Sequence, residues 1–226
     1  GQDIDGEAWD ENGSSVSISS DGNIVAIGAD GYYGNNDPKP TPGHVRGYQY
    51  NGNKWVQMGE VIAGDTEGDW NSYSLSLSSD GKIVAIGTFD NVPGNVSVYQ
   101  YNGNEWKKIG QDIGGKDKFS YIGELISLSS DGKTLARAVP FYFIPNAGGC
   151  GCSVNKVDSG YVRVYQYNID SDEWEQIGQD LDGEVEDDYT DLSVSFSSDG
   201  KTVAIGATYN DGNGYNSGHV RVYQYN

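Results

Sequence analysis

Cysteine, basic residues and long apolar segments are scarce in this sequence. Its 226 residues include only two cysteines, Cys150 and Cys152, too few for a framework of several disulfides. No run of about 18 apolar residues occurs, so we expect no membrane-spanning helix and no insertion into a membrane. The sequence also begins without a methionine or a signal-like apolar segment, and we expect a mature chain or a fragment.

Basic residues are outnumbered by acidic ones, with 14 Lys and Arg against 33 Asp and Glu and a formal net charge of −19. A polyanion such as DNA or RNA would be repelled by this charge. The composition therefore excludes nucleic acid as a partner. Solubility is the simplest explanation of the acidity, and binding of divalent cations or of cationic surfaces is the alternative.

Glycine and aromatic residues are plentiful, with 33 glycines and 12% Phe, Trp and Tyr. This mixture favours many short strands joined by tight turns over long helices. The tetrapeptide Ser-Ser-Asp-Gly also recurs along the chain, and its aspartates are Asp21, Asp80, Asp131 and Asp199. This recurrence indicates four internal repeats.

Each repeat contains the pattern of four short strands. In the first repeat, Val16 and Ile18 alternate with serines, which predicts a strand with one apolar face and one face of small residues. Asp-Gly suits the positive φ of a hairpin turn after it. Further strands are predicted at residues 24–28, at residues 45–50 and from Trp55 onward. The small residues would let neighbouring sheets approach closely, as the blades of a propeller do.

We therefore predict an all-β fold, a β-propeller of four tandem four-stranded repeats within a single domain over residues 1–226. The repeats are 1–58, 59–109, 110–177 and 178–226. They would form a four-bladed propeller or four blades of a larger one. The last repeat lacks its own Trp-bearing strand, which the other repeats mark with Trp55, Trp106 and Trp174. An unpaired edge of this kind invites pairing with another chain.

The fourth repeat carries the fullest set of motifs. It reads Ser-Val-Ser-Phe at 193–196, Val-Ala-Ile-Gly-Ala at 203–207, Asn-Asp-Gly-Asn-Gly at 210–214 and Ser-Gly-His-Val-Arg-Val-Tyr at 217–223. These motifs resemble the FG-GAP type of repeat of integrin α amino-terminal propellers, especially its algal and bacterial extracellular relatives. The resemblance spans the whole chain and implies a propeller used in extracellular adhesion or ligand recognition, with calcium in some blades. The family's calcium loop resembles Asp-x-Asp-x-Asp-Gly, whereas this chain has Ser-Ser-Asp-Gly there, so that site does not carry over.

Acidic residues at alternate positions form another kind of candidate cation site, at the start of three repeats. Carboxylates so spaced on a loop could supply several of the oxygen ligands that Ca²⁺ prefers. The alternative is a solvated acidic loop without a metal, in a protein that requires no cofactor. The candidate ligands are Asp3, Asp5, Glu7, Asp65, Glu67, Asp69, Asp180, Asp182 and Glu184. The third repeat reads Gly-Gly-Lys-Asp at 114–117 and would lack this site.

Arg137 interrupts an apolar strand, because the other repeats have Ile27, Ile86 and Ile205 at the same place. A buried charge needs a partner, and Glu124 is the nearest candidate in the sequence. Arg137 could contact an anionic ligand or a sugar acid, or it could form a buried ion pair.

Aromatic residues in the variable loops are candidate contact residues. The longest insertion runs from Pro140 to about Ser159 in the third repeat, and long loops on repeat scaffolds often carry function. Exposed aromatic rings could stack on a sugar or contact a partner protein. Alternatively, they could pack against their own blade. The candidates are Tyr32, Tyr33, Phe89, Phe141, Tyr142, Phe143, Tyr209 and Tyr215.

Two further pairs of residues suggest covalent modification. Cys150 and Cys152 are too close for an unstrained mutual bridge, so they could be free, form a strained ring or cross-link two chains. Asn12 and Asn95 begin the Asn-x-Ser pattern of N-glycosylation. We expect Asn12 in a loop, which makes it the better acceptor, and Asn95 at the border of a strand.

Signals for catalysis are weak. His44 and His219 stand at equivalent places of two repeats, and no nucleophile elbow, phosphate loop or metal-spaced histidine pair occurs. We therefore predict a non-catalytic structural or adhesive protein of the cell exterior or cell surface. It would contact other protein chains, including copies of itself in a head-to-tail filament. The alternative is a carbohydrate-binding, lectin-like propeller with glycans as ligands.

Overall fold

The chain forms β-strands, and none of the described residues is in a helix. The computed structural model describes residues 2–8, 10–29, 43–64, 70–89, 95–114, 125–139, 160–183, 190–208 and 210–225. The first sheet contains β1 (Asn12–Ile18), β2 (Ile24–Ala29), β3 (His44–Tyr50) and β4 (Trp55–Ala63). The second contains β5 (Trp70–Leu77), β6 (Ile83–Phe89), β7 (Asn95–Tyr101), β8 (Trp106–Lys108) and β9 (Ile113–Gly114).

The third and fourth sheets follow the same plan. The third contains β10 (Leu125–Leu128), β11 (Thr134–Val139), β12 (Tyr161–Asn168) and β13 (Glu173–Asp182). The fourth contains β14 (Thr190–Phe196), β15 (Thr202–Ala207) and β16 (His219–Gln224). From the first strand of each sheet onward, consecutive strands pair antiparallel, except that β9 pairs with β7 and not with β8. This arrangement confirms the predicted all-β propeller of four repeats. The fourth sheet has three strands in the described part of the chain, as expected without its own Trp-bearing strand.

The Ser-Ser-Asp-Gly segments form the predicted hairpin turns. In the first turn, the N–H of Ser19 donates to the carbonyl of Ile24 at 2.8 Å, and the N–H of Gly22 donates to the carbonyl of Ser19 at 3.0 Å. Gly22 adopts a φ of 72°, a left-handed conformation that suits glycine. The Ser19 hydroxyl donates to Asp21 at 2.6 Å, and the other three turns repeat this bond.

The hydrophobic core lies between consecutive sheets. Ile24, Val45 and Met58 of the first sheet pack against Leu77 and Val84 of the second, and two similar clusters join the second sheet to the third and the third to the fourth. The first strands of neighbouring sheets lie close together, whereas the fourth strands make fewer contacts with each other. This arrangement is that of successive propeller blades.

The fourth strand continues past the repeat boundaries that the sequence predicts. Gly59–Ala63 belongs to β4 of the first sheet, and Gly178–Asp182 belongs to β13 of the third. A bulge divides each of these strands where the register shifts, between Val45 and Gly47 on β3 and between Val162 and Val164 on β12. The expectation that acidic Asp180 and Asp182 lie in a loop is therefore wrong, because both belong to β13. Asp182 pairs with Tyr161 of β12, and Asp180 lies at the register shift, where its side chain binds Arg163.

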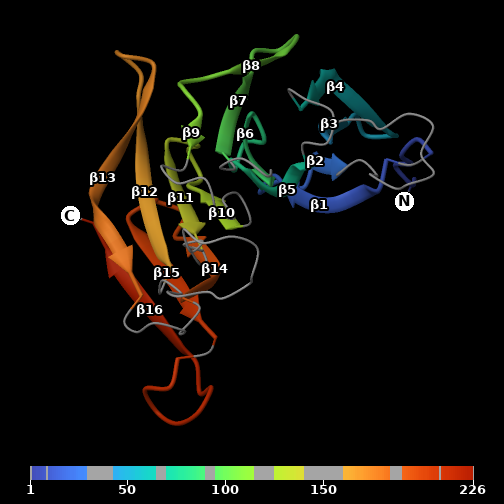
Figure 1. Ribbon diagram of the computed structural model, residues 1–226. Helices are drawn as coiled ribbons and strands as arrows, with labels where there is room; N and C mark the ends of the chain where they lie inside the picture. Colours follow the sequence, from blue (N-terminus) through green and yellow to red (C-terminus); the bar gives the residue numbers. More distant parts are fainter. Residues whose placement is uncertain are drawn as a thin grey trace, which may run out of the picture.

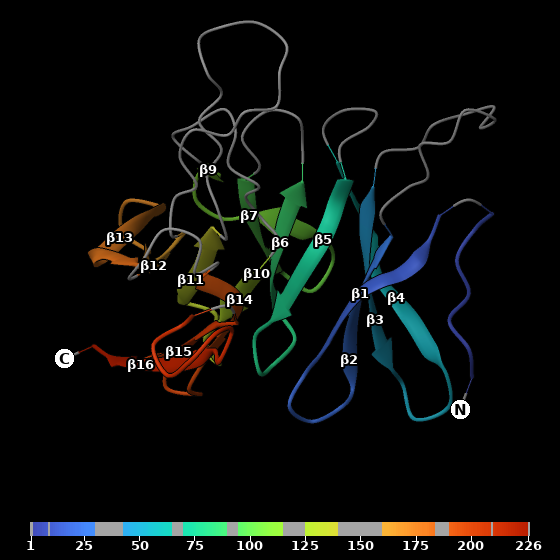
Figure 2. The same cartoon turned by 60° about the horizontal axis from the view of Figure 1, so that its bottom comes forward.

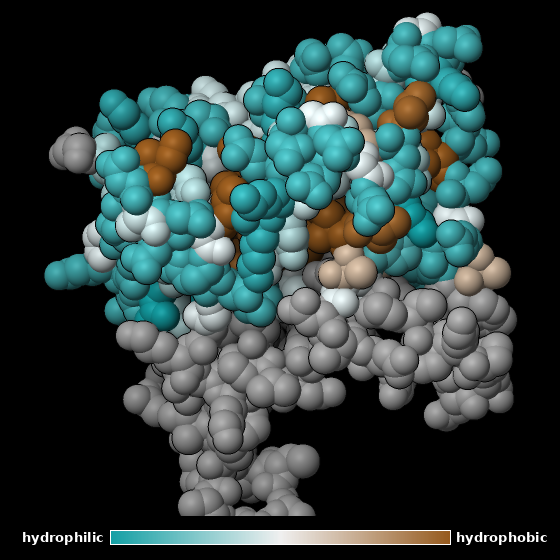
Figure 3. All heavy atoms as spheres, turned by 90° about the horizontal axis from the view of Figure 1, so that it is seen from above, coloured by the Kyte–Doolittle hydropathy of each residue, from teal (hydrophilic) through white to brown (hydrophobic). Residues whose placement is uncertain are grey.

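The four sheets succeed one another across the molecule in chain order, and the two termini lie at opposite ends of this row (Figures 1 and 2). Figure 3 shows one face of the molecule, on which hydrophobic residues form small patches separated by hydrophilic ones. The described strands give each of the inner junctions a packed core, and no comparable junction joins the first sheet to the fourth. Among the described strands, the first and last sheets therefore each have one face with no neighbouring blade.

Candidate functional site

The same hydrogen bond joins each pair of consecutive sheets. A serine on the first strand of one sheet accepts a bond from a backbone N–H on the first strand of the next. The pairs are Ser17 with Leu77 at 3.0 Å, Ser76 with Leu128 at 2.9 Å, and Ser127 with Phe196 at 3.1 Å. The corresponding serine of the last sheet is Ser195, which is exposed, and the corresponding N–H of the first sheet belongs to Ile18.

Turn glycines form a second repeated contact. A Cβ on Gly81 would lie 2.6 Å from the Cβ of Ile24 in the preceding sheet, and one on Gly132 would lie 2.5 Å from Cδ1 of Ile83. A Cβ on Gly200 would lie 2.8 Å from the Cβ of Ser129. The equivalent Gly22 of the first sheet has nothing within 4 Å of such a Cβ. The first sheet thus has the residues of a blade junction on this face, and no described strand packs against them.

Equivalent positions are buried at the inner junctions and exposed on the outer faces of the first and last sheets. Val45, Val96 and Val162 on the third strands are at most 1% exposed, whereas Val220 at the same place on β16 is 69% exposed. Val222 is 64% exposed, and on the first sheet Val16 and Ile18 are 65% and 61% exposed. We call Val16, Ile18 and Gly22 the amino-terminal end face, and Ser195, Val220 and Val222 the carboxy-terminal end face.

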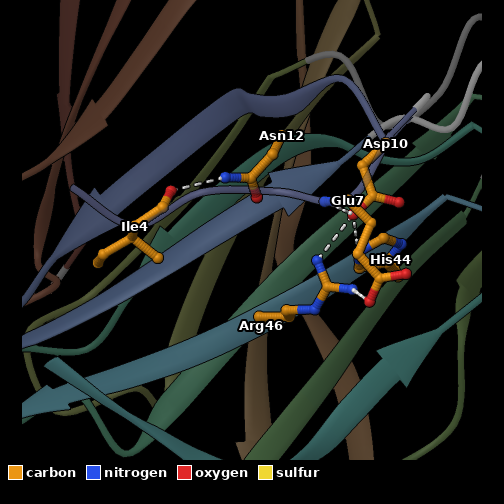
Figure 4. Close-up of polar contacts among 6 residues, drawn as sticks. All are labelled: Ile4, Glu7, Asp10, Asn12, His44 and Arg46. Atoms are coloured by element: carbon orange, nitrogen blue, oxygen red, sulfur yellow. Dashed lines mark hydrogen bonds and ion pairs between the residues drawn. The ribbon is translucent and has the colours of Figure 1, made fainter.

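Charged side chains cross-link the outer parts of the sheets. In the first sheet, Arg46 on β3 donates to Asp10 at 2.9 Å and to Glu7 at 3.3 Å, and His44 Nε2 lies 3.7 Å from Asp10 (Figure 4). Burial alone would raise the pKa of Asp10. The hydrogen bonds from Arg46 and from the N–H of Glu7, with the charge of His44, outweigh this and lower that pKa below its usual value.

The third sheet contains a bidentate ion pair at the equivalent place. Arg163 on β12 binds Asp180 on β13 with both ends of its guanidinium, at 2.8 and 2.6 Å. The hydrogen bonds to Asp180 raise the pKa of Arg163. Its guanidinium also lies 4.4 Å from the centre of the Tyr161 ring, a cation–π distance. In the second sheet, Ser97 stands at the place of Arg163 and Asp112 at the place of Asp180. The Ser97 hydroxyl donates a hydrogen bond to the Asp112 carboxylate.

Arg137 is fully buried between the second and third sheets, with 0% exposure. One of its terminal nitrogens donates to the carbonyls of Ile113 and Gly114 on β9, at 3.2 and 2.9 Å. In the described part of the chain its other two nitrogens have no hydrogen-bond partner. Burial lowers the pKa of Arg137. The sequence did not reveal these carbonyl partners, and Glu124 lies outside the described residues.

The candidate calcium ligands are only partly described. Asp3, Asp5 and Glu7 are exposed, and Asp180 is held by Arg163. No group of three His, Cys, Asp or Glu among the described residues is placed to hold a metal ion. Asp65, Glu67, Asp69 and Glu184 lie outside those residues, and calcium binding stays a prediction.

The remaining sequence candidates are scattered. Tyr215 is 89% exposed in the loop before β16, and Phe89 ends β6. Asn12 begins β1 and donates from its side-chain amide to the carbonyl of Ile4 at 3.1 Å, so its expected loop position is wrong. Asn95 begins β7, as expected, and accepts a bond from Thr88 at 2.9 Å. The candidates outside the described residues are Tyr32, Tyr33, Phe141, Tyr142, Phe143, Tyr209, Cys150 and Cys152.

No protein-family model matches the chain, and no curated protein sequence does. Solved structures resemble it in fold. Hydrazine synthase of Kuenenia stuttgartiensis has a TM-score of 0.52 at 15% identity, over 94% of this chain and 51% of that one. A prolyl endopeptidase has a TM-score of 0.52 at 13% identity, over 92% and 27%. Saccharomyces cerevisiae Sqt1 has 0.50 at 15%, over 90% and 44%.

These similarities establish the propeller fold and no more, because the identities are low. The chain spans about half the length of these proteins or less. In its described segments, no helix is long and apolar enough to cross a membrane.

Proposed function

We propose that this protein is a non-catalytic structural or adhesive module of the cell exterior or cell surface that contacts other protein chains through its two end faces. The supporting observation is the exposure of Val220, which is 69%, against at most 1% for the valines at the same place in the inner junctions. Contiguous apolar positions on a sheet face mark sites of association. The extracellular setting is supported by the resemblance to FG-GAP repeats.

Hydroxyl-radical footprinting of the native material tests this proposal. Val220 and Val222 should be oxidised less in the native material than in the purified chain at high dilution, because a partner covers them. Ile169 is the matched control, since it is 74% exposed in the β12–β13 turn and belongs to neither end face. Equal oxidation of Val220 in both samples would contradict the proposal. Recovery of the protein only from inside cells would contradict its extracellular part.

Tyr215 favours carbohydrate binding as a second candidate function. Its ring is 89% exposed, and exposed aromatic rings can stack on sugars. A glycan array should then give a signal that the Tyr215→Ala variant loses. A silent array for the unmodified chain would remove this candidate.

A further inference from the structure

The amino-terminal segment and the last strand repeat two segments that pair with each other in the third sheet. Residues 1–7 read Gly-Gln-Asp-Ile-Asp-Gly-Glu, and residues 178–184 read Gly-Gln-Asp-Leu-Asp-Gly-Glu. Residues 219–226 read His-Val-Arg-Val-Tyr-Gln-Tyr-Asn, and residues 161–168 differ from them only in beginning with Tyr. Each pair of segments differs at a single position, so the ends of the chain carry both partners of a known strand pairing.

The third sheet shows how these partners fit. Val162 pairs with Leu181 and Tyr161 with Asp182 along the edge of β12, while Arg163 binds Asp180 with two hydrogen bonds. The pairing lies beyond the bulge in β13, so it involves only the second half of the fourth strand.

The second sheet shows that this half-strand can pair as a separate element. β9 is distinct from the Trp-bearing β8, yet Ile113 pairs with Val96 and Gly114 with Asn95. A short segment carrying the Gly-Gln-Asp-Ile pattern therefore pairs beside the third strand without being part of a continuous fourth strand.

We propose that residues 2–7 of a second copy of this chain add as a strand to the outer edge of β16. In the register of the third sheet, Ile4 pairs with Val220, Asp5 pairs with His219, and Asp3 takes the place of Asp180 against Arg221. Backbone hydrogen bonds from an added strand supply affinity, and the side chains set the register. This inference rests on the proposed function and names its partner.

The added strand brings the two end faces together. The amino-terminal end face then covers the carboxy-terminal end face, as each inner blade covers the one before it. Ile18 donates its N–H to the Ser195 hydroxyl, as Phe196 does to Ser127. Val16 and Ile18 then cover Val220 and Val222. This contact removes the apolar side chains on both faces from water, which favours association.

A second copy, and not the chain's own amino terminus, is the partner because of where residues 2–8 lie. The carbonyl of Ile4 accepts a bond from Asn12 beside β1, at the opposite end of the row of sheets from β16 (Figures 1 and 2). Head-to-tail contacts of this type form rings if they close and filaments if they do not. Sheet-edge pairing between copies is a recognised outcome of exposed edges.

A charge swap between Asp3 and Arg221 tests the inference in the full chain. Asp3→Arg alone and Arg221→Asp alone each place like charges in the junction, and each should weaken self-association by about tenfold or more. An equimolar mixture of the two variants should associate again, because every junction in it can pair an arginine with an aspartate. Sedimentation velocity over a concentration series measures this. Asp170→Arg is the control, since Asp170 is exposed in the β12–β13 turn.

Each other outcome overturns the inference. A strictly monomeric unmodified chain, or single variants that associate like it, would exclude this junction, and so would a mixture that stays monomeric. A monomeric chain whose melting temperature falls on Asp3→Arg would indicate closure by its own amino terminus. If footprinting protects Val220 while the swap has no effect, another protein is the partner and the proposed function survives. If Val220 is unprotected in native material, the proposed function itself fails.

Discussion

Gly47 of the first sheet lies directly beneath the indole ring of Trp106 in the second. A Cβ at Gly47 would come within 2.7 Å of the indole Cζ2. The indole nitrogen of Trp106 donates to the carbonyl of Met58 at 2.9 Å, and Trp174 bonds to Ile109 in the same way one junction later. Valine stands at the place of Gly47 in the other repeats, but the first junction leaves no room for a Cβ between Gly47 and this indole ring.

Gly47→Ala should lower the free energy of unfolding by about 1–3 kcal/mol, because the added methyl group overpacks the first junction. Gly114→Ala is the matched control, since a Cβ there would have nothing within 4 Å and its effect should stay within about 0.5 kcal/mol. Urea unfolding followed by tryptophan fluorescence measures both. An effect of Gly47→Ala as small as that expected for the control would show that the indole shifts without cost.

Arg137→Ile should raise the free energy of unfolding by about 1 kcal/mol or more. The substitution removes a fully buried guanidinium and restores the residue type of the other repeats, and apolar replacement of buried charges is often stabilising. Chemical unfolding at neutral pH measures the change. A loss of stability would show that the bonds to Ile113 and Gly114 outweigh the cost of burying the charge.

Val162→Lys and Val220→Lys should have opposite consequences although they change equivalent residues. Val162 is 1% exposed, so a lysine there should cost more than about 3 kcal/mol or prevent folding. Val220 is 69% exposed, so the same change should alter the stability of the dilute chain by less than about 0.5 kcal/mol. Thermal melts at low concentration provide the comparison, and a large loss for Val220→Lys would mean that this face is already covered.

The carboxyl of Asp21 should titrate near pH 2. The hydrogen bond from the Ser19 hydroxyl, followed by that from the N–H of Asn23, lowers the pKa of Asp21 from its usual 3.8 to about 2. Its contribution to stability is therefore present above about pH 4 and lost as the pH falls through 2. Carboxyl ¹³C NMR should show the pKa rising in Ser19→Ala. It should be unchanged in Ser20→Ala, whose hydroxyl bonds to Ser79 instead.

The repeats and their hairpins could be predicted because local signals agree there. Alternating residues such as Val16 and Ile18 define a strand, and Asp-Gly defines the turn after it. The second half of the fourth strand escaped prediction, because Gly178 and Asp180 have low strand propensity and the bulge hides the alternation. Pairing with β12 outweighs these local preferences.

The candidate site was less predictable than the fold. An alternating pattern shows which face of β16 is apolar, but it does not show whether a neighbouring blade covers that face. The exposure of Val220 depends on packing between sheets, which local sequence does not encode. The partners of Arg137 are the backbone carbonyls of Ile113 and Gly114. Every residue has such a carbonyl, so the residue types at these positions do not predict the contact.

The recurring junction makes the sheets interchangeable units. Because Ser17, Ser76 and Ser127 each receive the next blade by the same bond, the geometry of one junction does not depend on how many others precede it. Duplication or loss of a whole blade would then leave every remaining interface intact. Proteins of this design can change length in blade-sized steps during evolution without repacking their cores.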